Sequence, residues 1–249
     1  YGMTNGRSAN FQTAQNNRGG TKLEDFVVTR VKDYAVVSVD NETLLAADGS
    51  EGSLLDVAKA KTDSALHVLS RTMGRDVYRS GTGSIMKLAA SSAVSGSVVT
   101  PLTAAGTIQV EVGMRLKGSA TDGSALYDGV LTVQSVDRTA NTFTTTVAPG
   151  TAMASLGNDD FLYVEGDAAD AGANIKMSGL DSWLPSTIAS SGDSHFGVNR
   201  YTDSTRLGGQ RQAVVSASIQ NTLINAAVLV AREGGRPDAV FMNPLDWAS

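Results

Sequence analysis

One stretch of this chain alternates like a β-strand but has too few bulky residues to form a compact domain of its own. It reads FVVTRVKDYAVVSV over residues 26–39, with small apolar side chains on alternate positions and Asp33 as an interruption. A period of two residues is typical of a strand. The pattern predicts a long extended segment or hairpin that packs against something else, and a partner subunit is one candidate.

The next stretch has the period of an amphipathic helix. Its apolar positions recur at helical spacing from Leu55 to Val77, over about seven turns. Ser53 followed by Asp56 resembles a capping box, and Gly81 suits the position after a helix C-terminus. The pattern predicts a helix over residues 53–79, whose narrow apolar stripe is suited to lying across a sheet.

Residues 91–165 change to short alternating runs separated by turns. The run from Ile108 to Leu116 predicts a half-buried antiparallel strand. VLTVQSVDRTANTFTTTV predicts a hairpin that turns near Asn141, and FLYVEG predicts a further strand. Because glycine- and alanine-rich stretches flank this block, we expect an inserted domain that forms a small β-barrel or sandwich.

The remainder of the chain contains a long loop and a second helix. The loop follows residue 176, and a loop of this length is usually functional or forms an interface. SIQNTLINAAVLVAREGG predicts a helix with Ile219, Leu223, Ala226 and Val230 on one face and Gly234 as its cap.

The last residues predict a buried strand followed by the start of a helix. DAVFM is a short apolar run between two prolines, as a buried strand would be. Asn243 has the chemistry of an N-cap, Pro244 suits the first helical position, and Asp246 favours the positive end of the helix dipole. Since the chain stops there and begins with Tyr1, we expect both ends to be incomplete.

Composition narrows the functional classes. The chain has 249 residues, which is enough for one large or two ordinary domains. Its net charge of −5 does not favour a protein that grips nucleic acid through a basic surface. The absence of cysteine excludes disulfides, thiolate nucleophiles and thiolate metal sites. The sequence contains no run of roughly 18 apolar residues, so we expect no membrane span.

No catalytic constellation emerges from the polar residues. The two histidines, His67 and His195, lack a second ligand at metal spacing, and no GxSxG nucleophile motif is present. SGTGSIMK does not match the phosphate-binding loop, and Asp159-Asp160 and the Asp167/Asp170 pair are more typical of solvated turns. We therefore expect no catalytic residues, no cofactor and no metal.

Three arginines of the long loop form a loose basic cluster: Arg200, Arg206 and Arg211. Two interpretations remain open for them. They form either a solvated face or salt bridges to a neighbouring acidic subunit.

The order of these parts closely resembles the major capsid proteins of tailed bacteriophages, whose fold is named after a Hong Kong bacteriophage and also builds encapsulins. The residues that carry the resemblance are YRSGTGS after the long helix, SGLDSWL, HFGVNRYTDSTRLGG and the closing PDAVFMNPLDW. In that family a strand and an Asn-Pro-x-Asp-Trp helix start open the axial domain. Here Asn243, Pro244, Asp246 and Trp247 match that start. The resemblance covers about residues 7–90 and 172–249.

The resemblance implies an α+β phage major capsid fold. Residues 1–50 would hold the N-terminal segment and an extended loop over 7–47, and 51–90 the peripheral domain with its spine helix. Residues 91–168 would be an inserted β-barrel outside the minimal fold. Residues 169–249 would return through the peripheral domain and the long loop to the beginning of the axial domain.

The resemblance also implies a non-enzymatic function. The chain would assemble into pentamers and hexamers of an icosahedral shell around double-stranded DNA, without sequence-specific binding, in the host cytoplasm. Scaffold, portal and decoration proteins are possible partners, and no membrane is involved. Some relatives cross-link a lysine to an asparagine, and Lys22 and Lys32 lie in the corresponding segment. Candidate interface residues are Phe11, Phe26, Arg30, Lys32, Tyr34, Trp183, Phe196, Arg200, Arg206 and Arg211.

Two other functions remain open from the sequence. An encapsulin-like compartment would share the fold but hold protein cargo. A secreted β-rich binding protein would instead use the inserted β domain as its working module. An enzyme is a weaker third alternative, which a hydrolytic activity lost on mutation of His195 would support.

Overall fold

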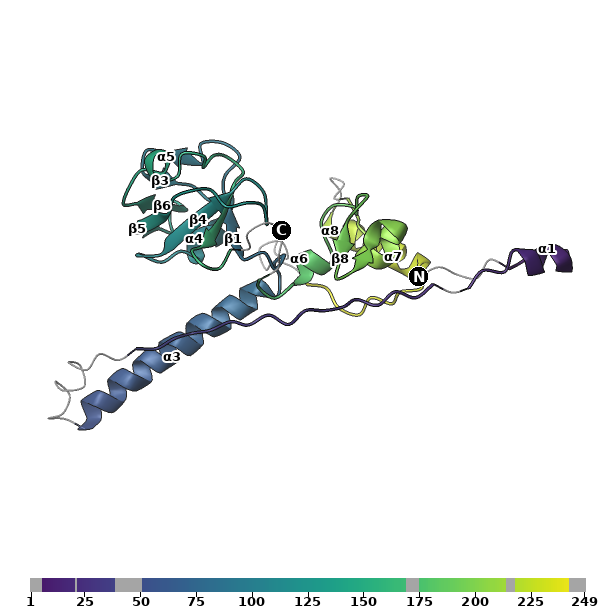
Figure 1. Ribbon diagram of the computed structural model, residues 1–249, viewed down its shortest axis with the longest axis horizontal. Coiled ribbons are helices and arrows are strands. Elements are labelled where there is room, and N and C mark those ends of the chain that lie inside the picture. Colours follow the sequence, from purple (N-terminus) through teal and green to yellow (C-terminus); the bar gives the residue numbers. More distant parts are fainter. Residues whose placement is uncertain (1–5, 21, 39–50, 169–174, 214–217, 242–249) are drawn as a thin grey trace. The chain divides into compact units, whose positions relative to one another are not determined.

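The computed structural model describes residues 6–20, 22–38, 51–168, 175–213 and 218–241, with the backbone alone for 51–58. These residues form an α+β structure of seven α-helices, one 3₁₀-helix, a seven-stranded antiparallel sheet and a two-stranded hairpin (Figure 1). The chain divides into two units, one of residues Arg30–Trp183 and one of Tyr1–Thr29 with Leu184–Ser249. The α+β class expected from the sequence is confirmed.

The seven-stranded sheet forms the larger part of the first unit. Every neighbouring pair of strands is antiparallel. In spatial order the strands are β1 (Ser84–Lys87), β7 (Phe161–Val164), β4 (Arg115–Ser119), β5 (Leu131–Asp137), β6 (Thr142–Thr145), β3 (Val98–Val99) and β2 (Val94–Ser95).

The expected closed β-barrel is not found in the described part of the chain. The sheet has two edge strands, β1 and β2, which do not pair with each other. Its two ends do approach, because Leu88 forms an isolated bridge with Pro101 and the Leu102 amide donates to the Lys87 carbonyl at 2.9 Å. Closure needs a continuous ladder around the sheet, and β2 and β3, with two residues each, are too short to provide it.

The sheet encloses one hydrophobic core, drawn entirely from residues 85–164. Its large side chains are fully buried: Ile85, Leu88, Leu116, Leu131, Phe143 and Leu162. The predicted hairpin is confirmed, since β5 and β6 pair around a turn in which Asn141 has φ 55°. Asparagine is among the few residues enriched in that left-handed region. The predicted strand in FLYVEG is confirmed as β7.

The predicted strand from Ile108 to Leu116 is wrong over most of its length. The chain forms a short helix, α4 (Ala104–Ile108), then a turn, and becomes extended only at β4. Gly113 has φ 86°, a left-handed conformation that interrupts a strand and that glycine adopts at no steric cost. Ile108 is 48% exposed because it ends this helix instead of facing the core. A second short helix, α5 (Pro149–Ala152), precedes β7.

The long helix predicted over residues 53–79 is confirmed as α3 (Glu51–Asp76). Ser53 lies inside this helix and so does not cap it. Gly81 is not the C-cap either, since the helix ends five residues earlier and Gly81 has φ 90° in the turn that leads to β1. The Arg71 guanidinium donates to the Ile108 carbonyl and pairs with Glu111, which connects α3 to the sheet region of the same unit.

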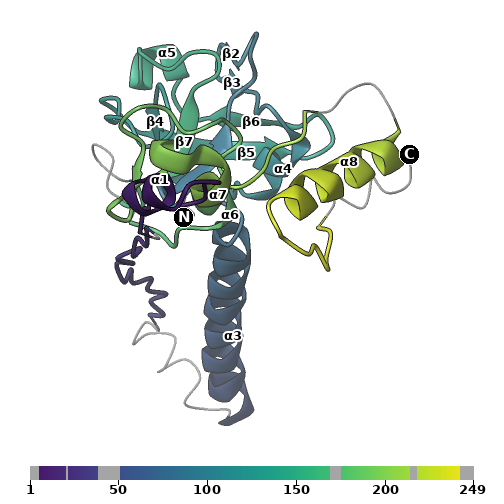
Figure 2. The same ribbon diagram turned by 90° about the vertical axis from the view of Figure 1, so that its right-hand side faces the viewer.

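Residues 22–38 form no strand and no hairpin among themselves. The alternative of an extended segment is the one observed, and the ribbon of residues 30–38 runs beside α3 in Figures 1 and 2. The first unit ends with a short helix, α6 (Leu180–Trp183).

The second unit contains short elements around a two-stranded hairpin. These are α1 (Phe11–Asn16), β8 (Ser194–His195), β9 (Val198–Asn199), the 3₁₀-helix η1 (Arg200–Asp203), α7 (Ser204–Gly208) and α8 (Ile219–Arg232). The predicted second helix is confirmed as α8. Its N-cap Ser218 accepts from the Asn221 amide, and Gly234 has φ 84° at its C-terminal end.

The predicted buried strand in DAVFM is wrong for residues 238–241. They have no secondary structure, and Phe241 is 80% exposed. Pro237 and the glycines before it separate these residues from α8, and no strand of the described chain lies beside them to supply a ladder. Residues 242–249, with the motif residues Asn243, Pro244, Asp246 and Trp247, lie outside the described part of the chain.

Candidate functional site

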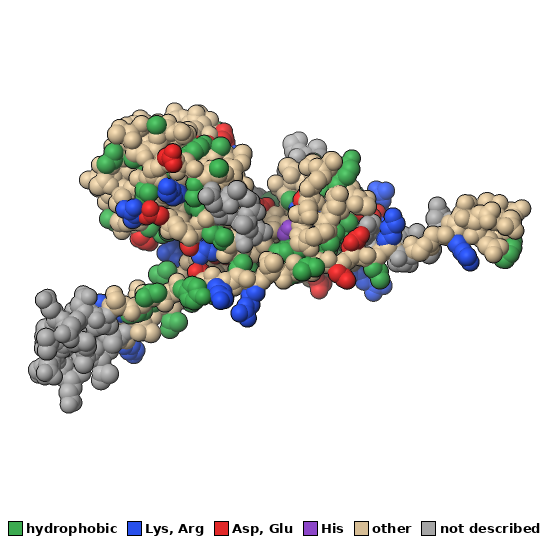
Figure 3. Space-filling model, in the orientation of Figure 1, with side chains coloured by type: hydrophobic (Ala, Val, Ile, Leu, Met, Phe, Trp, Pro, Cys, Tyr) green, Lys and Arg blue, Asp and Glu red, His purple; other side chains and the backbone are tan. Residues whose placement is uncertain are grey.

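Among the described residues, the extended segment of residues 22–38 exposes many apolar side chains. Its apolar side chains are largely uncovered: Leu23 is 82% exposed, Val27 71%, Tyr34 75% and Val36 89%. Arg30 and Lys32 are also exposed. Figure 3 shows apolar side chains gathered along the stretch that runs beside α3. Exposed apolar groups of this density mark a surface suited to contact with another surface.

Residues 30–38 run antiparallel to α3 and leave an open groove between them. Near its lower-numbered end the segment meets Leu69 and Met73, and near its higher-numbered end the Lys61 ammonium donates to the Ser38 carbonyl at 2.9 Å. The groove has a volume of about 590 Å³ and is lined mainly by small and apolar side chains with Lys61 and Lys176. The segment is therefore held at a few points and is not packed along its whole length.

Lys176 provides the strongest of these points. Its ammonium is buried, with 7% of the side chain exposed, and it contacts Asp33 at 3.0 Å and Asp167 at 3.1 Å. Burial lowers the pKa of Lys176, but the hydrogen bonds and charges of Asp33 and Asp167 outweigh it and raise the pKa above the ordinary lysine value. The lysine therefore stays charged and ties the extended segment to the end of the sheet region.

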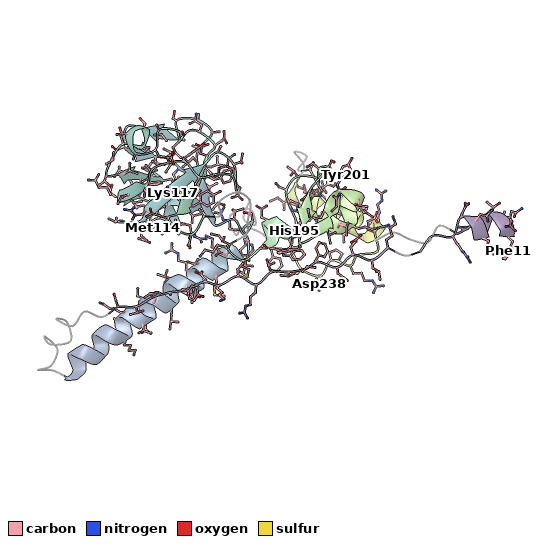
Figure 4. The ribbon with its side chains drawn as sticks, viewed as in Figure 1. Phe11, Met114, Lys117, His195, Tyr201 and Asp238 are labelled. Atoms are coloured by element: carbon pink, nitrogen blue, oxygen red, sulfur yellow. The ribbon has the colours of Figure 1, made fainter. Side chains whose placement is uncertain are left out.

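In the second unit the N-terminal part of the same segment docks on the β8–β9 hairpin. The Val27 amide donates to the Phe196 carbonyl at 3.0 Å. The Phe26 ring lies 6.2 Å from the ring of His195, and the Phe196 ring lies 4.5 Å from it on an edge-to-face geometry. Two candidate interface residues, Phe26 and Phe196, are thus brought together around His195, which is labelled in Figure 4.

The arginines of the long loop have partners within the chain. Arg200 is buried and pairs with Asp193 at 3.0 Å. Arg206 pairs with Asp203 and with Glu233 at 3.1 Å, which connects α7 to the end of α8. Arg211 donates to the carbonyls of Pro185, Gly208 and Gly209. Internal bonding of this kind was not foreseen from the sequence, and contact of these arginines with a neighbouring subunit remains a prediction.

The other candidate interface residues lie apart from these contacts. Phe11 is 80% exposed on α1 (Figure 4), and Trp183 is half-buried at the end of α6. The described residues cover the apolar face of α8 only in part, since Leu223, Ala226 and Val230 are half-buried. Together with residues 237–241 it lines a groove of about 610 Å³ that is mostly apolar, and none of the side chains of α8 is buried.

A polar network that the sequence did not indicate joins the end of α3 to the sheet. The Asp122 carboxylate accepts from Ser80 and Thr82, which follow the helix, and from the Tyr163 hydroxyl of β7. Tyr163 also accepts from the Gly123 amide at 2.9 Å. Burial raises the pKa of the Tyr163 hydroxyl, so it remains a donor at neutral pH. The sequence YRSGTGS contains the hydroxyls of Ser80 and Thr82, but only the fold shows that both donate to Asp122.

We also searched the described residues for metal-binding groups and for helices that could span a membrane. Within them no group of three or more histidine, cysteine, aspartate or glutamate side chains could hold a metal ion. Of the helices described, none is long and apolar enough to cross a membrane.

Comparison with known proteins finds no match for this chain among protein-family models, curated proteins or solved structures.

Proposed function

We propose that this chain is a structural shell subunit of the phage major capsid type, which self-assembles into an icosahedral capsid around double-stranded DNA and is not an enzyme. The observation that supports this most is the extended segment of residues 22–38. It is ordered along α3 and the β8–β9 hairpin, yet it leaves Leu23, Val28 and Val36 more than half exposed.

The balance between conformational entropy and apolar burial favours a binding partner for such a segment. Fixing the backbone of each residue costs about 1–2 kcal/mol of conformational entropy. Burial of apolar surface returns about 25 cal/mol per Å², and within one chain the segment buries little. A neighbouring subunit that covers its exposed side offsets the remaining cost. Helix α8 supports the same conclusion, because none of its side chains is buried among the described residues.

The net charge of the chain also supports a shell that encloses DNA without binding it strongly. The chain carries a net charge of −5. Strong binding to DNA depends on many phosphate contacts from lysine and arginine. In the loop that holds most of the candidate arginines, Arg200 and Arg206 are already paired with acidic side chains of the same chain.

The finer assignment rests on the resemblance to capsid proteins. In it, residues 7–47 are the extended loop that lies over a neighbouring subunit, α3 is the spine helix, and residues 91–168 are an inserted domain outside the minimal fold. Asn243, Pro244, Asp246 and Trp247 open the axial domain. Pentamers and hexamers, with scaffold, portal and decoration proteins as partners, would form the virion capsid in the host cytoplasm.

Electron microscopy and light scattering of the gently purified protein test the proposal. Closed shells that contain nucleic acid are the expected result. Closed shells that contain protein cargo would instead support an encapsulin-like compartment. A monodisperse monomer that remains so with its co-expressed neighbouring genes would support a binding module built on the β-sheet domain.

A single substitution gives a sharper test of the role of the segment. Val36→Asp places a charge on a side chain that is 89% exposed, so the fold of the single chain should be unaffected. We expect it to reduce shell formation strongly, because the charge would be buried at the subunit contact. Val147→Asp, at a 51% exposed site outside the segment, is the matched control and should assemble normally. Equal assembly of both variants would show that the segment does not form the contact between subunits.

A further inference from the structure

The turn between β8 and β9 has an unusual backbone. Phe196 has φ 48° and Gly197 has φ 87°, so both central residues of the turn have positive φ. Hairpins of this type favour asparagine followed by glycine. For a bulky residue such as phenylalanine the left-handed region is a genuine outlier. Outliers of this kind persist where surrounding contacts enforce them, and they cluster at functional sites.

The contacts around Phe196 come from its own hairpin and from the N-terminal segment. The His195 ring lies 4.5 Å from the Phe196 ring and 6.2 Å from the Phe26 ring, so the imidazole pairs with one aromatic ring of its own hairpin and one of the N-terminal segment. The Phe196 carbonyl, oriented by the turn, accepts from the Val27 amide at 3.0 Å. Edge-to-face aromatic pairs at these distances are attractive. His195 is therefore the centre of the contact that holds residues 26 and 27.

The surroundings of His195 disfavour a positive charge. Its side chain is buried, with 7% of the residue exposed. The charged groups that act on it are Arg200 of η1 and Asp193 before β8, and these two already pair with each other. The N-terminal segment contributes the Phe26 ring, and its nearest charged residue along the chain is Asp25. An imidazolium would thus be buried beside the Arg200 guanidinium.

We propose that His195 is a pH-sensitive latch: the neutral imidazole holds Phe26 and Val27 on the β8–β9 turn, and its protonation releases the N-terminal segment. This inference goes beyond the proposed function and stands whether or not the chain forms a shell.

The direction of the pH effect follows from linkage. Burial lowers the pKa of His195, Arg200 lowers it further, and Asp193 opposes both. Release of Phe26 exposes the imidazole and moves its pKa toward the ordinary histidine value of about 6.5, so the docked state binds fewer protons than the released state. Docking is fully stable above that pH and weakens as the pH falls below it.

Amide exchange measured by NMR on the full chain tests the latch. We expect the protection factor of the Val27 amide to fall between about pH 7.5 and about pH 5, by up to about thirtyfold, the limit set by an ordinary released pKa of about 6.5. The imidazole signal of His195 should titrate with the same midpoint. His67→Gln removes the other histidine of the chain and assigns that signal.

Two substitutions separate the latch from a general effect of acid. His195→Phe keeps an aromatic ring beside Phe26 and Phe196 but cannot be protonated, so Val27 should stay protected at both pH values. Phe26→Ala should leave Val27 unprotected at both and return the His195 titration toward its ordinary range, which keeps the test decisive if His195→Phe does not fold. A change in Val27 protection below about twofold, or an equal pH dependence in His195→Phe, would overturn the proposal.

Discussion

A single buried lysine provides the strongest contact between residues 30–38 and the rest of the first unit. Lys176→Met would keep most of the side-chain volume and remove the charge that holds Asp33 and Asp167. Both carboxylates are partly exposed and can be solvated when the lysine is lost. We therefore expect a destabilisation of about 1–3 kcal/mol, the range for unsatisfied hydrogen-bonding groups, and not the larger cost of an isolated buried charge.

Urea unfolding measures this loss, and amide exchange over residues 30–38 localises it. Lys59→Met, an exposed position on α3, is the matched control and should change stability by less than about 0.5 kcal/mol. If residues 30–38 keep their protection in Lys176→Met, the lysine does not anchor the segment.

The Asp122 carboxylate has a comparable role between the end of α3 and the sheet. It accepts hydrogen bonds from Ser80, Thr82 and Tyr163. In Asp122→Ala these three hydroxyls lose a charged acceptor in a partly buried site, which we expect to cost about 1–3 kcal/mol in the free energy of unfolding. Thermal or urea unfolding measures it. Asp128→Ala, at an exposed position of the same region, should be nearly neutral, and equal effects of the two variants would contradict the role assigned to the network.

The helices and strands show what periodicity can and cannot predict. α3 and α8 were predicted within a few residues, because their apolar spacing extends over several turns and caps mark α8. The β5–β6 hairpin was also predicted, since Asn141 suits a left-handed turn. The strand predicted from Ile108 to Leu116 was wrong. The apolar alternation there continues through a short helix and a turn at Gly113, and the local pattern does not distinguish these from a strand.

The contacts of the candidate site were less predictable than its segments. The extended segment was expected from its alternation. Its attachment points, Lys176 and the β8–β9 turn, depend on residues distant in sequence, and no local pattern relates residue 33 to residue 176 or residue 27 to residue 196. The same is true of the arginines: their spacing predicted a cluster, but their acidic and carbonyl partners follow from the fold.

The sheet core offers a direct check of where the stability of the first unit lies. Leu131 on β5 is fully buried in the hydrophobic cluster. Leu131→Ala should destabilise the protein by about 2–5 kcal/mol, through lost burial and the cavity that remains. Leu102→Ala removes the same atoms at a position that is 50% exposed and should cost less than about 1 kcal/mol. Urea unfolding of both variants makes the comparison, and similar losses would show that this sheet core does not dominate stability.

The two units differ in how much of their own surface they bury, and this difference predicts how each depends on assembly. Nearly all the buried apolar side chains of the described residues belong to the sheet core of the first unit, whereas Ala189 and Val198 are those of the second. Helix α8 has no buried residue there, and an isolated helix of its length, 14 residues, is marginal in water. Most helical stability in proteins comes from packing of an apolar face, and the described residues bury no side chain of α8.

We therefore expect α8 amides of the dispersed chain to exchange at least about tenfold faster than those of β4, β5 and β7, because local opening requires little free energy where few apolar contacts are lost. On assembly the same amides should become protected, since a partner that binds only the ordered state stabilises it. Hydrogen exchange with mass spectrometry, on dispersed and assembled samples of one preparation, measures both, with the β4 and β7 peptides as the internal reference. Strong protection of α8 in the dispersed chain would show that this helix needs no covering surface, and would remove one of the two structural supports for a shell subunit.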